Sequence, residues 1–292
     1  MVELPAAEVA AAAQLACLLE VSAPKPGNVS PGRHFTDARY EDFLASAAAI
    51  GGPLGDAGRR PVGETIFRAI EAASRWTRSN TNLGIVLLLA PLARAALVGS
   101  GTDLRAALGR VLEETTVADA REAYAAIRLA APGGLGRAEE QDVAGEPDVT
   151  LLEAMRLAAG RDGIAREYVT RFGVTFEAGA PSLRQARRDG LSWEDAVVET
   201  FLTLLAGNPD THIARRSGAA LADAVTRRAE RVLAAGGVRS PEGRRAIGEM
   251  DRELREAPHG TSPNSANPGT TADLTAAAIF VVLLGGGWSA SS

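Results

Sequence analysis

The chain has 292 residues, of which 46% are hydrophobic and 23% charged, which is ordinary for a globular protein with ample material for a core. Its formal net charge of −5 argues against a general nucleic-acid binder, so an anionic ligand would have to be held by local features. The single cysteine, Cys17, excludes an internal disulfide and a multi-cysteine metal site.

The first ten residues, MVELPAAEVA, carry acidic residues where a secretory signal would carry basic ones. The longest apolar stretches, LGIVLLLAPLA and LTAAAIFVVLLGGGW, fall short of the roughly 20 residues that a spanning helix needs. We therefore expect a cytoplasmic protein with no membrane association.

Apolar residues recur at helical spacing along the chain, and no segment shows the alternation of a strand. In PVGETIFRAIEAASRW the apolar stripe includes Val62, Ile66 and Ile70, and in LSWEDAVVETFLTLLAG Ser192 is a predicted N-cap. The fold prediction is all-α, with a single globular multi-helix domain over residues 1–292. The predicted helices are 5–20, 38–50, 61–76, 81–98, 103–114, 117–129, 150–171, 191–207, 211–235, 241–256 and 271–284.

Lysine occurs once, at Lys25 in SAPKPGNVSPG, while the other 30 basic residues are arginine, and asparagine occurs only six times. All seven lie in loops or at predicted helix starts, within PKPGNVS, SNTNLGI, AGNPDTHI and SPNSANPGTTADL. Asparagine favours turns and caps, which explains a single case but not the recurrence of small polar residues at helix starts.

A helix start combines free backbone N–H groups with the positive end of the helix dipole, and so suits a phosphate group. A lysine in a loop stiffened by two prolines could add a compact positive charge. The pattern predicts a nucleotide or polyphosphate site without a P-loop, since no GxxxxGK[ST] motif occurs. The candidate phosphate-binding residues are Lys25, Gly27, Asn28, Asn80, Thr81, Asn82, Asn267, Gly269 and Thr270.

Several carboxylates give a second signal. Glu20 extends the apolar stripe of the first helix at its C-terminal end, where a negative charge needs a cation or a metal as partner. Asp162 and Arg166 continue the stripe of the 150–171 helix, so an inward charged pair is predicted, and a purely structural ion pair stays open. Asp142, in GLGRAEEQDV, is either part of a site or part of a solvated acidic turn with Glu139 and Glu140.

Asp210 and Asp273 lie at predicted helix starts, where capping is the simplest explanation. None of His34, His212 and His259 has a partner at zinc-ligand spacing, so a histidine-based metal site is not expected. An acidic site facing phosphates suits Mg²⁺. The candidate metal ligands are Glu20, Asp142, Asp162, Asp210 and Asp273.

Seven segments in chain order resemble the triphosphoribosyl-dephospho-CoA synthases. They are LEVSAPKPGNVS, VGETIFRAI, NTNLGIVLLLAPL, GLGRAEEQDV, MRLAAGRDGIAREY, NPDTHIARRSG and NPGTTADLTAAAIF, and they span residues 19–280. The resemblance implies an all-helical transferase that binds ATP with Mg²⁺. It joins the 5-triphosphoribosyl group of ATP to the 2'-hydroxyl of 3'-dephospho-CoA and releases adenine, making a prosthetic-group precursor.

Such a reaction displaces an N-glycoside through an oxocarbenium-like state, which nearby carboxylates stabilise, as in glycosidases. An α-linked product from β-configured ATP requires inversion and hence a single displacement. In this setting Asp142, Asp162 and Glu20 are the candidate catalytic residues, and Arg166 and Arg215 join the candidate phosphate-binding residues.

The sequence departs from the family pattern at three places. Gln141 precedes Asp142 where histidine is common, Arg215-Arg216 stands where Arg-Lys is common, and Ala23-Pro24 stands where an aromatic residue is common. These changes leave the acceptor open. The alternatives are a related ribosyl or ribosyl phosphate transferase acting on another alcohol, such as a pterin-type C1 cofactor precursor, and a non-catalytic nucleotide-binding protein. A monomer and a homo-oligomer both remain open.

Overall fold

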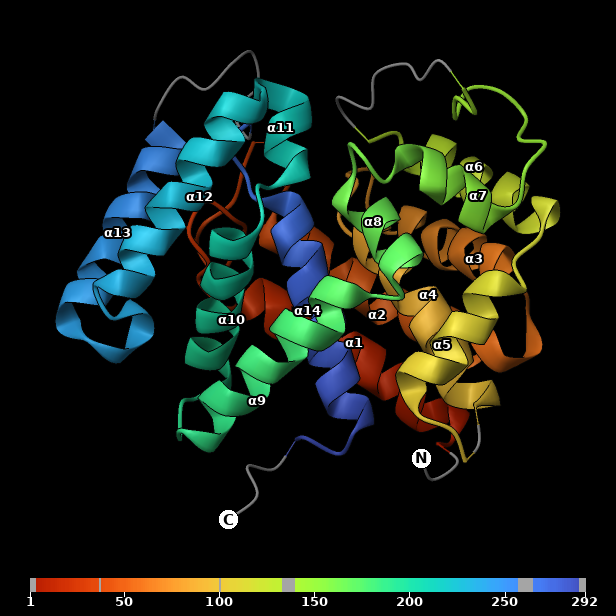
Figure 1. The fold of residues 1–292 in the computed structure, drawn as a ribbon, viewed down its shortest axis with the longest axis horizontal. Helices are drawn as coiled ribbons and strands as arrows, with labels where there is room; N and C mark the ends of the chain where they lie inside the picture. Colours follow the sequence, from red (N-terminus) through yellow and green to blue (C-terminus); the bar gives the residue numbers. More distant parts are fainter. Residues whose placement is uncertain (1–3, 37, 100, 133–139, 257–264, 289–292) are drawn as a thin grey trace.

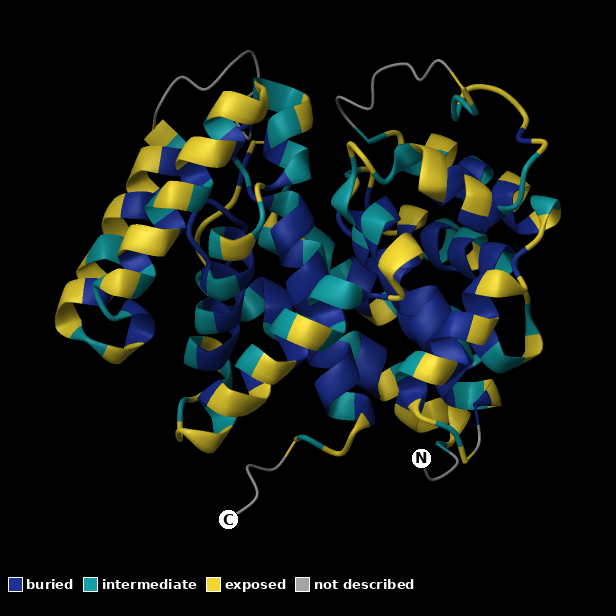
Figure 2. Cartoon of the chain, in the orientation of Figure 1, coloured by how far each residue is buried: buried dark blue, intermediate teal, exposed yellow. Residues whose placement is uncertain are grey.

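Two helices that are buried on nearly every side form the centre of the molecule. They are α4 (Leu83–Val98) and α14 (Gly269–Leu284), and twelve and thirteen of their sixteen residues are buried. Helices that are hydrophobic all round are typical of a core. α4 and α14 contact each other, with α1 packed against both, α10 against α14, and α3 and α5 against α4. Figure 2 shows their dark blue ribbons inside a shell of mixed exposure.

The computed structural model describes residues 4–36, 38–99, 101–132, 140–256 and 265–288. In these ranges the regular elements are helical, apart from two isolated β-bridges, at Ser30/Arg33 and Phe35/Ala38, so the all-α prediction is confirmed. The other α-helices are α1 (Ala6–Ser22), α2 (Tyr40–Gly55), α3 (Val62–Ser74), α5 (Leu104–Glu113), α6 (Val117–Ala130), α7 (Leu151–Ala158), α8 (Gly163–Thr170), α9 (Ala180–Arg188), α10 (Trp193–Gly207), α11 (Thr211–Ser217), α12 (Ala219–Ala234) and α13 (Pro241–Glu256).

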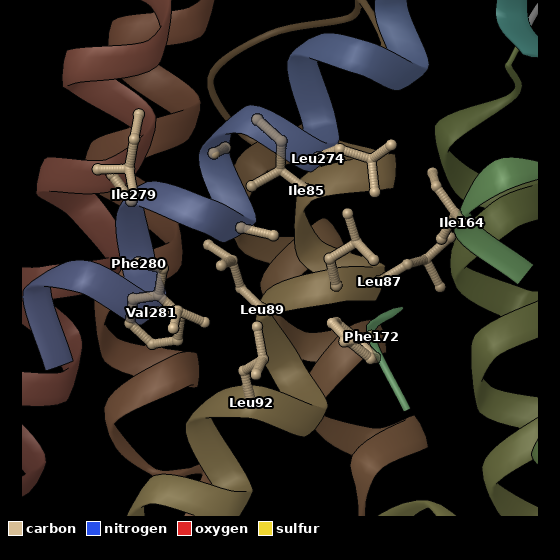
Figure 3. Close-up of a cluster of buried hydrophobic side chains, with 14 of the residues drawn as sticks. Ile85, Leu87, Leu89, Leu92, Ile164, Phe172, Leu274, Ile279, Phe280 and Val281 are labelled. Atoms are coloured by element: carbon tan, nitrogen blue, oxygen red, sulfur yellow. The ribbon is translucent and has the colours of Figure 1, made fainter. Parts of the chain in front are cut away.

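Apolar side chains from α4, α14 and α8 meet in the centre (Figure 3). Leu87 and Leu89 of α4 lie between Ile164 of α8 on one side and Phe280 and Val281 of α14 on the other. The core therefore connects the start of α8 to the two central helices, and it holds their N-terminal ends at the same end of the molecule (Figure 1).

Two predicted helices are each two helices in the structure. The 150–171 segment divides into α7 and α8, because Asp162 caps a new helix. The 211–235 segment divides into α11 and α12 at Gly218, whose φ of 91° is incompatible with a continuous helix. α9 was not predicted: only Ala180, Leu183 and Ala186 are buried in it, too few for a clear apolar stripe. The predicted cap at Ser192 is confirmed, because its hydroxyl accepts from the Asp195 N–H at 3.1 Å.

Candidate active site

A cavity of about 1000 Å³ opens among the N-terminal ends of the central helices. Side chains of α6, α7 and α8 line one side, and α11 with the start of α12 lines the other. In Figure 1 these two groups lie on opposite sides of the N-terminal end of α14. The volume is at the upper end of the range for small-molecule sites, enough for a nucleotide and part of a second ligand.

Four helices start at this cavity. Leu83 and Gly84 of α4, Ile164 of α8, Thr211 of α11 and Thr270 of α14 line it. Each helix directs the positive end of its dipole toward the place where it starts, so the cavity favours an anion. The sequence prediction of a phosphate site at the starts of the NTNLG and NPGTTADL helices matches this location.

Hydrogen bonds hold three of these helix starts together. The Gly163 N–H donates to the Thr211 hydroxyl at 3.0 Å, and the Thr211 and Thr270 hydroxyls are 3.1 Å apart. A side chain on Gly163 would bring its Cβ to 2.9 Å from the Thr270 methyl group, so only glycine allows this approach. The starts of α8, α11 and α14 therefore form one connected unit.

Asp210 fastens α11 to α14. Its carboxylate accepts from the Ile213 N–H at 3.0 Å and from both the N–H and the hydroxyl of Thr271 at 2.7 Å. Burial raises the pKa of Asp210, and these donors oppose the shift. The predicted cap is confirmed, and Asp210 is buried outside the cavity lining, so the structure gives this candidate metal ligand a structural place.

Arginine supplies the positive charge of the cavity. The guanidinium-bearing residues that line it are Arg78, Arg161, Arg166, Arg215 and Arg216. This local excess of cations lies within a chain whose formal net charge is −5. Planar guanidinium groups suit phosphate oxygens, which they bind in a bidentate manner. The cavity thus has the local positive groups that an anionic ligand would need in a protein of negative net charge.

Asp162 lines the cavity. The sequence-based prediction that it forms an inward pair with Arg166 is wrong. Its carboxylate caps α8, accepting from the N–H groups of Ile164 and Ala165 at 2.9 and 3.0 Å. Its ion-pair partner is Arg215, at 3.5 Å. Arg166 instead donates to the Ala159 carbonyl at 3.4 Å. The prediction assumed one continuous helix, and the break before α8 changes which residues share a face.

Asp142 also lines the cavity, in the loop between α6 and α7. Its carboxylate accepts from the Ala144 N–H at 2.8 Å, which closes a turn. The Tyr124 hydroxyl donates to the Gln141 carbonyl at 2.6 Å, and burial together with the nearby Asp142 charge raises the pKa of Tyr124. The neighbouring Glu140 lines the cavity as well, while Glu139 lies outside the described residues.

Asp273 differs from the other acids. It lies on α14 four residues after Gly269, so it does not cap the helix, and its carboxylate has no hydrogen bond or ion pair within the described residues. Burial, followed by the charges of Glu20, Asp210 and Asp162, raises its pKa well above the usual range, and Arg215 opposes this. A Cβ at Gly84 would lie 2.0 Å from its Oδ2 atom.

Glu20 and Lys25 form a buried pair outside the cavity lining. The Lys25 ammonium forms an ion pair with Glu20 Oε1 at 2.9 Å and donates to the backbone carbonyls of Glu20 and Ala23. Burial raises the pKa of Glu20 and lowers that of Lys25, and their mutual attraction opposes both shifts. The prediction that Glu20 needs a cation is confirmed, but the structure places Lys25 away from the expected phosphate site.

The rest of the loop that contains Lys25 packs against α13 and against the segment before α14. Gly27, at φ 73°, donates its N–H to Asp251 at 2.8 Å, and a Cβ there would lie 2.7 Å from a Leu254 methyl group. The Asn28 side chain donates to Asn267 Oδ1 at 2.9 Å. Asn28 therefore positions a cavity residue without lining the cavity itself.

The structure brings half of the predicted site residues together. Those that line the cavity are Asn80, Asp142, Asp162, Arg166, Arg215, Asn267, Thr270 and Asp273. Those outside the lining are Glu20, Lys25, Gly27, Asn28, Thr81, Asn82, Asp210 and Gly269.

Thr81 forms a hydrogen bond with the Ser46 hydroxyl, and Asn82 is buried, so both support the start of α4 from behind. Gly269 lies against His212, whose Nδ1 would be 2.1 Å from a Cβ at this position.

Sequence reasoning missed several cavity residues. The most informative are Gly84, Arg78, Arg161, Arg216 and His212. Each is adjacent to or inside a segment that was singled out, so proximity to those segments was the available signal. Which of many arginines faces a cavity depends on helix rotation, which the sequence alone does not specify.

An all-helical fold with a cavity built from helix starts, arginines and carboxylates has the features of an anion-binding site. A family model supports a narrower assignment, because residues 6–292 match the ATP:dephospho-CoA triphosphoribosyl transferase family, CitG. The chain therefore belongs to this family, as the sequence resemblance indicates.

Named relatives agree with the family assignment. A Pseudomonas paraeruginosa protein named "Probable 2-(5''-triphosphoribosyl)-3'-dephosphocoenzyme-A synthase" is 33% identical over 142 residues. These residues are 48% of this chain and 46% of that relative, so the match spans about half of each protein. A Pseudomonas syringae pv. tomato protein with the same name is 29% identical over 155 residues, or 46% of this chain and 51% of that protein.

A solved structure from Archaeoglobus fulgidus, assigned as a triphosphoribosyl-dephospho-CoA synthase, is similar in fold. It has a TM-score of 0.64 and 31% identity, and the match covers 84% of this chain and 99% of that one. Among the described residues, no helix is long and apolar enough to cross a membrane.

Proposed function

We propose that this protein transfers the 5-triphosphoribosyl group of ATP to the 2'-hydroxyl of 3'-dephospho-CoA and releases adenine. The observation that carries this proposal is a single cavity that combines four helix starts and five arginines with the carboxylates Asp142, Asp162 and Asp273. The cationic features suit a triphosphate, and the carboxylates suit a sugar carbon that becomes positively charged.

The two kinds of surface suggest how the ligands are arranged. Arg161 precedes α8, Arg166 lies in the first turn of α8 and Arg215 lies in the last turn of α11. These three arginines would bind the triphosphate. The sides of α6 and α7 present apolar residues such as Ile127 and Met155, which suit the flat adenine base and the apolar part of the acceptor arm. The ribose then lies between these regions, within reach of the carboxylates.

The reaction is a displacement at C1' of the ATP ribose. The bond from C1' to adenine N9 breaks, and N9 keeps the electron pair. The acceptor 2'-oxygen forms the new bond to C1' and loses its proton, which finally reaches the adenine. Inversion at C1' requires the acceptor and the adenine to lie on opposite faces of the ribose, which a cavity between two helix groups allows.

Mg²⁺ fits this cavity as a companion of the triphosphate. Among the described residues no group of three His, Cys, Asp or Glu side chains could hold a metal ion on its own. Mg²⁺ in nucleotide sites usually needs only one or two carboxylates together with substrate phosphates. Asp142 and Asp162, which both line the cavity, would hold the ion, and the ion would supply charge neutralisation for the phosphates.

The expected setting is the cytoplasm, where ATP and dephospho-CoA are available as small-molecule substrates.

Purified protein with ATP, Mg²⁺ and dephospho-CoA should release free adenine in an acceptor-dependent way, measured by liquid chromatography. CoA is the matched control acceptor, because its 3'-phosphate crowds the 2'-hydroxyl, and it should give much less adenine. Formation of ADP or AMP instead would identify a kinase or nucleotidyl transferase, and tight ATP binding without turnover would favour a non-catalytic nucleotide-binding protein.

A further inference from the structure

Among the acids around the cavity that are at least partly buried, Asp273 alone has both carboxylate oxygens uncommitted within the described residues, whereas Glu140, which also lines the cavity, is exposed to solvent. Asp210 accepts three hydrogen bonds, and Asp162 accepts two while facing Arg215. Asp142 uses one oxygen to close its own turn. A group that accepts a proton during catalysis needs a free lone pair within hydrogen-bond reach of its substrate.

The fold makes room for this carboxylate. Gly84 lies against Asp273 so closely that a Cβ would be 2.0 Å from Oδ2, and both residues line the cavity. Arg215, the cation that lowers the pKa of Asp273, forms its ion pair with Asp162 at 3.5 Å, and Lys25 is paired with Glu20. Asp273 is therefore held at the cavity by the start of α14 and has no ion pair of its own within the described residues.

We infer that Asp273 is the catalytic residue that accepts the proton of the acceptor hydroxyl, an inference that rests on the proposed function. As the acceptor oxygen forms its bond to C1', its O–H bond breaks and the proton moves to the Asp273 carboxylate. The C1'–N9 bond breaks at the same time, and adenine leaves with the electron pair. The proton then passes from Asp273 through water to adenine, so the carboxylate is regenerated.

The surrounding charges support this role. Glu20 on α1, Asp210 before α11 and Asp162 before α8 all raise the pKa of Asp273, in addition to its burial, and Arg215 lowers it. A carboxylate with increased proton affinity is a stronger base than an ordinary exposed one. Activity should consequently rise with pH through the raised pKa of Asp273.

The test compares Asp273→Asn with the wild type and with Asp195→Asn, a control on the surface of α10. The Asp273 variant should lose about 10²-fold or more in kcat for adenine release, because a positioned base contributes that much. Its ATP Kd, measured by calorimetry, should stay within about twofold, or about 0.4 kcal/mol. The acid limb of the pH–rate profile should also disappear. The control should match the wild type in all three measurements.

Asp273→Ala provides a second variant with the same expected results, so an unstable Asn variant does not decide the question. Near-normal kcat, a retained acid limb, or a loss of ATP binding equal to the loss of activity would each overturn the proton-acceptor role while leaving the transferase proposal intact. A wild-type protein that releases no adenine with dephospho-CoA would instead overturn the proposed function, and the inference with it.

Discussion

The loop around Lys25 and the start of α14 carry the same sequence signal but have different surroundings. Both combine rare residues with proline and glycine, in PKPGN and NPGTT. Lys25 is fully buried and paired with Glu20, whereas Asn267 and Thr270 line the cavity. The two regions touch through the hydrogen bond between Asn28 and Asn267. A residue type that is rare in the sequence can thus belong to a buried structural pair or to a ligand-binding cavity, and only the fold distinguishes the two.

The largest expected effect is in the Lys25 loop. Lys25→Met should lower the free energy of unfolding by about 3–5 kcal/mol, because it leaves the Glu20 charge buried without a partner. Urea unfolding followed by circular dichroism measures this change. The double variant Glu20→Gln/Lys25→Met should recover most of the loss, since no charge is then buried. A single variant as stable as the wild type would show that the pair is not a structural support.

A smaller effect is expected for the cavity arginines. Arg161→Gln or Arg166→Gln should raise the ATP KM by about 10- to 100-fold, in line with 1.5–3 kcal/mol for a hydrogen bond to a charged group. Steady-state kinetics with adenine release as readout measures it. Arg245→Gln on the exposed side of α13 is the matched control and should leave KM unchanged. Equal KM values for the cavity variants and the control would move the triphosphate elsewhere.

Gly84→Ala tests the close approach of α4 to Asp273. The added methyl group cannot fit 2.0 Å from Oδ2, so α14 or the carboxylate must shift, at a cost of about 1–3 kcal/mol. We expect a lower Tm together with reduced kcat. Gly52→Ala, at a helical position with open space around the added atom, should keep kcat at the wild-type value. An active Gly84→Ala enzyme would argue against the position assigned to Asp273.

The smallest expected effect is the pH dependence of stability. The pKa of Asp273 is higher in the folded state than in the unfolded state, so the protonated carboxyl group stabilises the folded protein relative to the charged one. This stabilisation is lost as the pH rises through the folded-state pKa and the carboxyl group ionises. Asp273→Asn should therefore be more stable than the wild type at neutral pH, with the difference shrinking toward acidic pH. Thermal unfolding without ligand across this range measures it. A pH-independent difference would contradict the raised pKa.

The fold was largely predictable because α4 and α14 are so apolar that only a core can accommodate them. The helix starts at the cavity were also predictable, since Asn80, Asp210 and Thr270 belong to clear capping segments. The break at Asp162 was not, because its residues fit a longer helix at i+3 and i+4 spacing. The free carboxylate of Asp273 could not be predicted, because an acid caps its own helix only if the helix begins next to it. α14 begins at Gly269, earlier than the sequence predicts, so Asp273 lies inside the helix and does not cap it.

The most direct test of the account uses ATP labelled in its γ-phosphate, with dephospho-CoA and Mg²⁺, in a single turnover of the wild-type enzyme. The account predicts that the label appears in an adduct whose mass equals ATP plus dephospho-CoA minus adenine, with an equal amount of free adenine. Label in free phosphate, pyrophosphate or phosphorylated dephospho-CoA, without adenine, would contradict triphosphoribosyl transfer in this cavity.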